Sequence, residues 1–529
     1  MAAATLFARF LGFLYRLPLT DLIGDKGNAL YGVGYQFYLF LLVLSSAGLP
    51  NAVSKMVSER IARGQYRNAH GVFRSAMTVA VIFGFIGTIL LWIFAQNLAI
   101  RFGYPGSAYA IRAISPAVLI VAVMAVYRGY FQGMGNAAPT AVSQVVEQVF
   151  NAAFKLLLAY IIYRQLELGL EWAAAGAAAG TGVGALLGLL TVFLIYRRIS
   201  HKIQYRIRRE PYESDYYVSE HYESGFYEPE RPRKLIKEVL CTAFPIILGA
   251  AIYSIANFID MSMVSQRMGS SGVFTQTEID ALYGQLTGKF VVLTTLPVSI
   301  STALAITVLP SIAGSNITRD YKAVMVKITK ALRLSALISI PAAVGISVMA
   351  EPILLLLFPN HPEGAILLQV GGVSIIFLSL VQVTAGALQG IGKIIIPVIG
   401  AGAGALAKIP LNYVLIVQPE INVLGAVIST IVCYFIAFVI NLGVLKKYTR
   451  FHIDWIGTFF KPLIAAAVMG LTCFASYFIL MAVTYENNFV STFISVVLGM
   501  TVYFVVLIMI GGLDKDDVGK LPLIRRLVV

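Results

Sequence analysis

Long hydrophobic segments recur from one end of the chain to the other, and few charges interrupt them. A helix needs about 20 apolar residues to cross the hydrocarbon core of a bilayer. Alternation of the kind found in membrane β-strands is not evident, which disfavours a β-barrel. The sequence therefore predicts an all-α integral membrane protein. We expect fourteen transmembrane helices, near residues 3–24, 29–54, 72–97, 108–133, 137–163, 173–197, 238–264, 283–312, 326–350, 364–389, 394–417, 422–445, 459–483 and 489–511.

The amino-acid composition excludes several other classes of protein. Hydrophobic residues make up 58% of the chain and charged residues only 12%, whereas soluble proteins carry about 25% charged residues. A soluble enzyme, a nucleic-acid-binding domain and a disordered chain are therefore excluded. The formal net charge of +14 is then expected to mark cytoplasmic loops rather than a surface that binds nucleic acid.

Basic residues are distributed unevenly between the loops that join the predicted spans. Loops on one side carry clusters of lysine and arginine, as at Arg60 to Arg74 and at Lys446, whereas loops on the other side are mostly acidic, as at Glu167 and Glu363. Cytoplasmic loops retain lysine and arginine, so this asymmetry predicts that both termini are cytoplasmic. The N-terminal segment has no basic region or cleavage site, and we interpret it as the first span rather than a signal peptide.

Short sequence patterns recur in the same order about 250 residues apart, which indicates an internal duplication. The recurring patterns pair Ala29–Gly32 with Ala281–Gly284, Gln132–Gly135 with Gln389–Gly392, Lys155 with Lys408, and Gly176 with Gly425. Each copy holds six spans, and because six is even the two lobes share one orientation as parallel repeats. The predicted domains are an N-terminal lobe at 1–197, a cytoplasmic linker at 198–234, a C-terminal lobe at 235–447, and two extra spans with a cytoplasmic tail at 448–529.

The sequence has no recognisable catalytic or metal-binding motif. The three cysteines lie far apart, the five histidines have no metal-ligand spacing, and neither a P-loop nor a nucleophile elbow occurs. We therefore predict a protein that is not an enzyme and that uses no metal or cofactor. A membrane-embedded glycosyl- or acyltransferase is an alternative, but it would need a catalytic acid or histidine on a large outer loop, where His361 stands alone.

Polar and ionisable residues lie inside several predicted spans, where they are costly and usually face a bundle interior or an aqueous cavity. In the fifth span they recur at the spacing of one helical face. These residues are Gln144, Glu147, Gln148, Asn151 and Lys155. Other spans contribute Arg9, Arg16, Asn257, Asp260, Lys289, Lys408 and Asn412.

Two interpretations of these polar residues remain open. They pair internally, for example Glu147 with Lys155 and Asp260 with Lys408, or they line a cavity. We favour a cavity because the stripes are long and the basic residues outnumber the acidic ones, which suits an anionic substrate. A different pattern, glycine at Gly176, Gly180, Gly184 and Gly188, is interpreted as a helix-packing surface.

Three segments resemble the MurJ-like and stage V sporulation protein B-like proteins of the multidrug/oligosaccharidyl-lipid/polysaccharide (MOP) exporter superfamily. They are Arg128–Gln148 (RGYFQGMGNAAPTAVSQVVEQ), the N-terminal RFLGFLYRLPL, and the LP…VLPS run within Leu296–Ser311. The resemblance extends over essentially the whole chain. It implies two lobes that alternate access and flip lipid-linked sugars, and it implies lipid II as the substrate of the MurJ members.

The resemblance also implies roles for individual residues. Arg9 matches the first arginine of the family's first span, and Arg16 lies one residue after the usual position of the second. Asp260 falls where the family has an acidic or amide residue, in a region that forms a sodium site with the eleventh span in some members. A fixed ammonium in place of sodium is therefore expected. The residues expected to form this ion pair or coupling site are Asp260, Asn257, Lys408 and Asn412.

The chain departs from the MurJ pattern at two places. Leu42 and Val43 stand where the family has basic residues late in the second span, and Val292 stands at the family arginine of the eighth span. Lys289 lies one turn earlier on roughly the same helical face. These departures keep a different lipid-linked glycan open as the substrate.

The sequence and the resemblance together predict a flippase for an undecaprenyl-pyrophosphate-linked cell-wall precursor, with lipid II as the expected substrate. Arg9, Arg16 and Lys289 are expected to hold the pyrophosphate, while the membrane potential or an ion gradient drives alternating access. We expect a monomer in the bacterial cytoplasmic membrane, with the bilayer, the lipid-linked glycan and the cell-wall synthesis machinery as partners. The alternatives are a flippase for another lipid-linked polysaccharide unit and a multidrug exporter of the same fold, whose cavity would be acidic.

Overall fold

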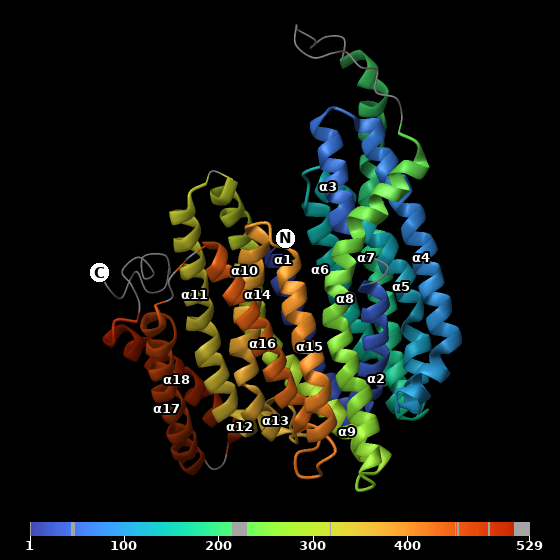
Figure 1. Cartoon of the computed structure of the whole chain (residues 1–529). Coiled ribbons are helices and arrows are strands. Elements are labelled where there is room, and N and C mark those ends of the chain that lie inside the picture. Colours follow the sequence, from blue (N-terminus) through green and yellow to red (C-terminus); the bar gives the residue numbers. More distant parts are fainter. Residues whose placement is uncertain are drawn as a thin grey trace. The chain divides into compact units, whose positions relative to one another are not determined.

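The structure is a computed structural model that describes residues 2–43, 48–213, 230–317, 319–449, 451, 454–484 and 487–512. All regular elements in these ranges are helices, as predicted (Figure 1). Part of the predicted linker, 214–229, and most of the predicted tail lie outside the described residues. Contacts divide the chain into two compact units: residues 1–269 with 275–284, and residues 270–274 with 285–529.

The first unit contains nine α-helices within its described residues. They are α1 (Ala2–Leu14), α2 (Arg16–Leu42), α3 (Leu49–Ala62), α4 (Tyr66–Arg101), α5 (Ala108–Gly133), α6 (Ala138–Tyr160), α7 (Leu170–Glu213), α8 (Pro232–Ser270) and α9 (Gln276–Gln285). A π-helical turn at Ile161–Gln165 follows α6. The helix α2 is interrupted at Gly24, whose φ of 65° and ψ of −176° are a conformation that only glycine adopts readily.

The second unit contains nine further α-helices within its described residues. They are α10 (Val291–Ile317), α11 (Tyr321–Val348), α12 (Ala350–Leu357), α13 (Ala365–Gly371), α14 (Val373–Gly390), α15 (Ile395–Leu415), α16 (Leu424–Thr449), α17 (Lys461–Val483) and α18 (Asn488–Met509). One core joins α10, α11, α14 and α16. A second core packs α17 and α18 against α11, where the Tyr503 hydroxyl donates to the carbonyl of Leu337 at 2.9 Å.

Eleven helical segments of the described chain are long and apolar enough to cross a membrane. They coincide with eleven of the predicted spans. The predicted spans near 3–24, 29–54 and 238–264 fall on α1 to α3 and on α8, which are not among the eleven. In α2 the charged residues Arg16, Asp25 and Lys26 lower the hydropathy. The multi-span helical fold is confirmed, and the count of fourteen spans stays a prediction.

The compact units differ from the predicted lobes at α8. The predicted C-terminal lobe begins at residue 235, yet α8 belongs to the first unit. Its residues Leu235 and Val239 are buried in one core with Val53 and Val72 of α3 and α4. This core attaches α8 to the preceding helices. The division into duplicated lobes rests on the sequence repeat and stays a prediction.

Candidate functional site

The predicted polar stripe of α6 lies against α7 in the first unit. Asn151 and Lys155 are buried, while Gln144, Glu147 and Gln148 are half-buried. The facing surface of α7 consists of the predicted glycine ridge. A Cβ atom on Gly180 would lie 2.5 Å from the backbone nitrogen of Lys155, and one on Gly184 would lie 2.6 Å from the Cβ of Asn151. The ridge therefore serves close packing, as predicted.

Lys155 is held by aromatic side chains from the first two helices. It is 1% exposed, and its Nζ donates hydrogen bonds to the hydroxyls of Tyr31 at 2.7 Å and Tyr15 at 3.0 Å. The ammonium also lies 4.5 Å from the ring centre of Tyr15 and 5.3 Å from that of Tyr35. Hydroxyl acceptors and cation–π contacts therefore stabilise a buried positive charge.

Arg16 belongs to the same cluster. Its guanidinium carbon lies 5.6 Å from the ring centre of Tyr31, and the guanidinium also interacts with the Tyr15 hydroxyl. The structure thus brings together two of the predicted site residues, Arg16 and Lys155, through shared tyrosines. We call Tyr15, Arg16, Tyr31, Tyr35 and Lys155 the tyrosine–cation cluster.

Glu147 forms its ion pair with Arg128 of α5. The Arg128 Nη2 lies 2.7 Å from Glu147 Oε2, and the same guanidinium donates to the Ser143 hydroxyl. The interpretation in which Glu147 pairs with Lys155 is therefore wrong. The reason is geometric. Lys155 lies two helical turns from Glu147 and donates to Tyr15 and Tyr31, whereas Arg128 of α5 lies directly opposite Glu147.

Three predicted site residues lie in the second unit. Lys289 is 1% exposed, in the π-helical turn Leu286–Phe290, and its Nζ donates to the carbonyl of Glu363 at 3.0 Å. Its ammonium lies 3.8 Å from the Glu363 carboxylate and 5.8 Å from the ring centre of Phe358. In α15, Lys408 and Asn412 are buried one turn apart, and the side-chain oxygen Oδ1 of Asn412 accepts a hydrogen bond from the Ser429 hydroxyl.

The remaining site predictions stay predictions. Arg9 lies on α1, and its side chain is outside the described residues. Asp260 and Asn257 lie on α8 in the first unit, half-buried and exposed. The residues expected to bind pyrophosphate belong to different units, and so do Asp260 and Lys408. Both groupings therefore stay hypotheses.

Sequence reasoning missed Arg128 and the three tyrosines. Arg128 stands inside the RGYFQGMG segment, and a cation on one helix facing an acid on the next was a detectable signal. Tyr31 and Tyr35 are one turn apart on one face of α2, a spacing that was also available. Among the described residues no three His, Cys, Asp or Glu side chains are placed to hold a metal ion together.

Comparisons with known proteins identify the family of the chain. The sequence model of the family described as "Polysaccharide biosynthesis protein" matches residues 1–316, and the MatE model matches residues 245–414. The chain is 28% identical to the lipid II flippase MurJ of Bacillus subtilis (strain 168), over 99% of this chain and 96% of the relative. It is 24% identical to the stage V sporulation protein B of the same organism, over 100% and 98%.

Solved structures share the fold. An inward closed conformation of a lipid II flippase MurJ matches with a TM-score of 0.68 at 16% identity, covering 95% of this chain and 97% of that one. An inward-facing multidrug resistance transporter of the MATE family and MOP superfamily matches with a TM-score of 0.65 at 16% identity, covering 84% and 96%.

Fold and comparisons define the class as a multi-span, all-helical transporter of the MOP superfamily, related to MurJ and MATE proteins and located in the cytoplasmic membrane. It is a transporter rather than an enzyme. The chain belongs to the polysaccharide biosynthesis protein family, whose model covers more than half of it.

Proposed function

We propose that the protein flips an undecaprenyl-pyrophosphate-linked cell-wall precursor, with lipid II as the substrate, from the inner to the outer leaflet. The observation that carries this proposal is the tyrosine–cation cluster, in which Arg16 and Lys155 place two cations beside tyrosine side chains. Cations suit a pyrophosphate headgroup. A carrier of organic cations would need acidic groups at such a place.

The substrate is inferred from the relatives. MurJ of Bacillus subtilis is described as a lipid II flippase and is similar to this chain over 96% of its length. In our proposal Arg16 acts with Arg9 and Lys289 on the pyrophosphate, Arg16 providing a bidentate donor and Lys289 a point charge. The half-buried Gln144 and Gln148 of α6 are proposed to line the path of the sugar and peptide, whereas Asn151 supports this stripe from its buried position against Gly184. The lipid tail is proposed to stay in the bilayer.

The driving force is proposed to be the membrane potential acting on bound charge, worth about 2.3 kcal/mol per elementary charge per 100 mV. Lys408 is proposed to replace a sodium ion beside Asp260, so that transport does not require sodium. Transport that depends on sodium and loses this dependence in Asp260→Ala would contradict this part of the proposal. Both termini are proposed to be cytoplasmic, because the basic loops are on their side.

Cells depleted of their own lipid II flippases provide the test. Expression of this chain is expected to restore lipid II on the outer leaflet, measured by its accessibility to an externally added reagent. Arg16→Ala is expected to abolish the restoration at normal abundance in the membrane. Arg164→Ala is the matched control, because Arg164 is an exposed arginine of the same unit, and it is expected to keep full activity.

A second candidate substrate is another undecaprenyl-linked polysaccharide unit, such as a teichoic or capsular unit. It is favoured by Leu42, Val43 and Val292, which stand where the MurJ pattern has basic residues. Normal expression without restored lipid II, together with restored export of a different lipid-linked glycan, would select this candidate.

A further inference from the structure

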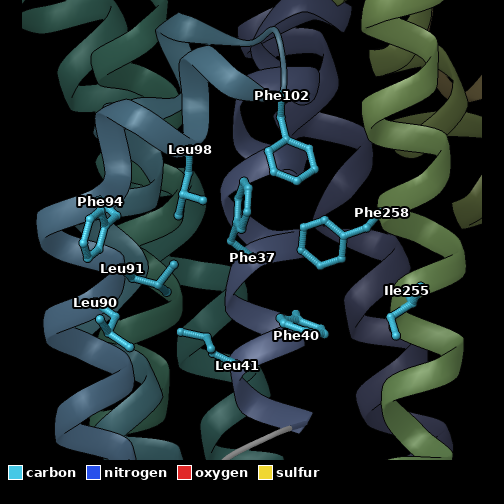
Figure 2. A pocket seen from close by; sticks show the side chains of 10 residues that line it. All are labelled: Phe37, Phe40, Leu41, Leu90, Leu91, Phe94, Leu98, Phe102, Ile255 and Phe258. Carbon is cyan, nitrogen blue, oxygen red and sulfur yellow. The ribbon is translucent and has the colours of Figure 1, made fainter.

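An apolar pocket opens between α2, α4 and α8 of the first unit (Figure 2). None of its lining residues belongs to the tyrosine–cation cluster. Its volume is about 510 Å³, within the range of about 300–1,000 Å³ that small-molecule sites occupy. Its lining side chains are hydrocarbon throughout: Phe37, Phe40, Leu41, Leu90, Leu91, Phe94, Leu98, Phe102, Ile255 and Phe258.

The pocket has a buried floor and an exposed rim. Phe37 and Leu91 are 5% and 2% exposed, whereas Leu90 and Ile255 are 46% and 44% exposed. Phe258 closes one wall through edge-to-face ring contacts with Phe37 and Phe40 at 5.1 Å, and Figure 2 shows these rings turned toward one another. The mouth therefore opens at the outer surface of α4 and α8.

Hydrocarbon is the only chemistry that suits this lining. A water molecule needs two to four polar partners, which these side chains do not offer. Large apolar residues of α4 near the mouth, including Phe85 and Trp92, are exposed as well, as is expected of a helix facing lipid. The material at the mouth is thus the hydrocarbon of the bilayer, and its chains are the available ligands.

A cation stands on the same face of α4 at the end of the pocket. Leu90, Phe94, Leu98 and Arg101 are spaced i, i+4, i+8 and i+11, so they lie along one helical stripe. Arg101 is exposed and is the last residue of α4. An arginine at a helix end binds a phosphate group at the membrane surface while the apolar stripe below it contacts the attached chain.

We propose that this pocket is a binding site for one anionic glycerophospholipid, with an acyl chain between α2, α4 and α8 and its phosphate at Arg101. The inference does not depend on the transported substrate. A retained lipid here stabilises the attachment of α8 to α2 and α4, because the chain contacts all three helices.

The test uses the full-length protein in nanodiscs that contain phosphatidylglycerol and phosphatidylethanolamine. A phosphatidylglycerol with a photoactivatable acyl chain is crosslinked, and the labelled residues are mapped by peptide mass spectrometry. We expect labels on the pocket residues of α4 and α8. Leu90→Trp, which fills the mouth, should lower labelling by about tenfold, as expected when a ligand's contacts are lost. Ile93→Trp is the matched control, since Ile93 is exposed on α4 outside the pocket.

The headgroup is tested separately. Wild type should prefer phosphatidylglycerol to phosphatidylethanolamine, and Arg101→Gln should remove this preference, whereas Arg164→Gln should keep it. Thermal unfolding and gel filtration establish that each variant is folded. The crosslinking map of the wild-type protein tests the pocket without any variant. Equal labelling of Leu90→Trp and Ile93→Trp, or labels spread evenly over lipid-facing helices, would overturn the proposal. Stronger labelling of the pocket by a polyprenyl phosphate probe would overturn the assigned occupant.

Discussion

Lys155 is a buried lysine whose ammonium is bonded by tyrosine hydroxyls. The one-face spacing of the α6 stripe predicted that Lys155 would lie inside the protein, and the structure buries it. Its partners were not predictable from that spacing, because Tyr15 and Tyr31 are 140 and 124 residues away in the sequence. Local periodicity reveals which face of a helix is polar, whereas the groups that satisfy it depend on tertiary packing.

This arrangement predicts that Tyr31→Phe destabilises the protein. The change keeps the ring but removes an acceptor at 2.7 Å from the Lys155 ammonium, and leaving a buried donor without its partner costs about 1–3 kcal/mol. Thermal unfolding in detergent measures the effect. Tyr35→Phe is the control, because Tyr35 contacts the ammonium through its ring. Equal unfolding temperatures for the two variants would contradict the assigned role of the Tyr31 hydroxyl.

The pairing of α6 with α7 shows how much a sequence reveals about an element. Glycine at four-residue spacing predicted a packing ridge, and α6 lies against it. The partner of the ridge was not predicted, since any neighbouring helix would satisfy the same pattern. The placement of α8 was also not predicted: the sequence repeat assigns this helix to the C-terminal lobe, whereas its contacts place it in the first unit.

Gly180→Ala is predicted to destabilise the α6–α7 pair. The new Cβ would lie 2.5 Å from the backbone of Lys155, and overpacking of this kind costs about 1–3 kcal/mol. Gly182→Ala is the matched control on the same helix, where a Cβ would meet no atom within 4 Å. Thermal unfolding of both variants is the measurement, and a loss of stability in Gly182→Ala as large as in Gly180→Ala would refute the packing role.

Arg60 fastens the start of α8 to the end of α3. Its Nη2 lies 2.6 Å from Glu230 Oε2 and 2.7 Å from Glu238 Oε2. Burial lowers the pKa of Arg60, but the hydrogen bonds that it donates to both carboxylates, together with their negative charge, outweigh burial and raise the pKa above its usual value. The Glu230 amide also donates to the side chain of Asn68. Arg60, which in the sequence served only to predict which loops are cytoplasmic, therefore also joins two helices of the fold.

Arg60→Ala is predicted to loosen the first turns of α8, because two carboxylates then lose their shared cation. Hydrogen exchange of the amides around Leu235 should accelerate. Arg63→Ala is the control, since Arg63 is an exposed arginine of the same segment. Unchanged exchange in Arg60→Ala would show that the hydrophobic core of Leu235 and Val239 holds α8 alone.

At the scale of the whole molecule, the sequence predicts the fold class, whereas the substrate site stays a prediction. Hydrophobic length indicated a multi-span helical protein, and the described helices and the related structures confirm that class. The proposed pyrophosphate site draws on residues of both units, and sequence spacing carries no information about distances between segments that are far apart in the chain. Only the part within the first unit, Arg16 with Lys155, is therefore assembled here.

The most direct test of the central claim is lipid II translocation by the purified protein in sealed liposomes under a membrane potential. We predict that lipid II crosses faster than in protein-free liposomes, that collapse of the potential slows it, and that Arg16→Ala reduces it to the protein-free rate. Arg164→Ala should match wild type. Translocation at the protein-free rate by a folded, correctly inserted wild-type protein would contradict the account.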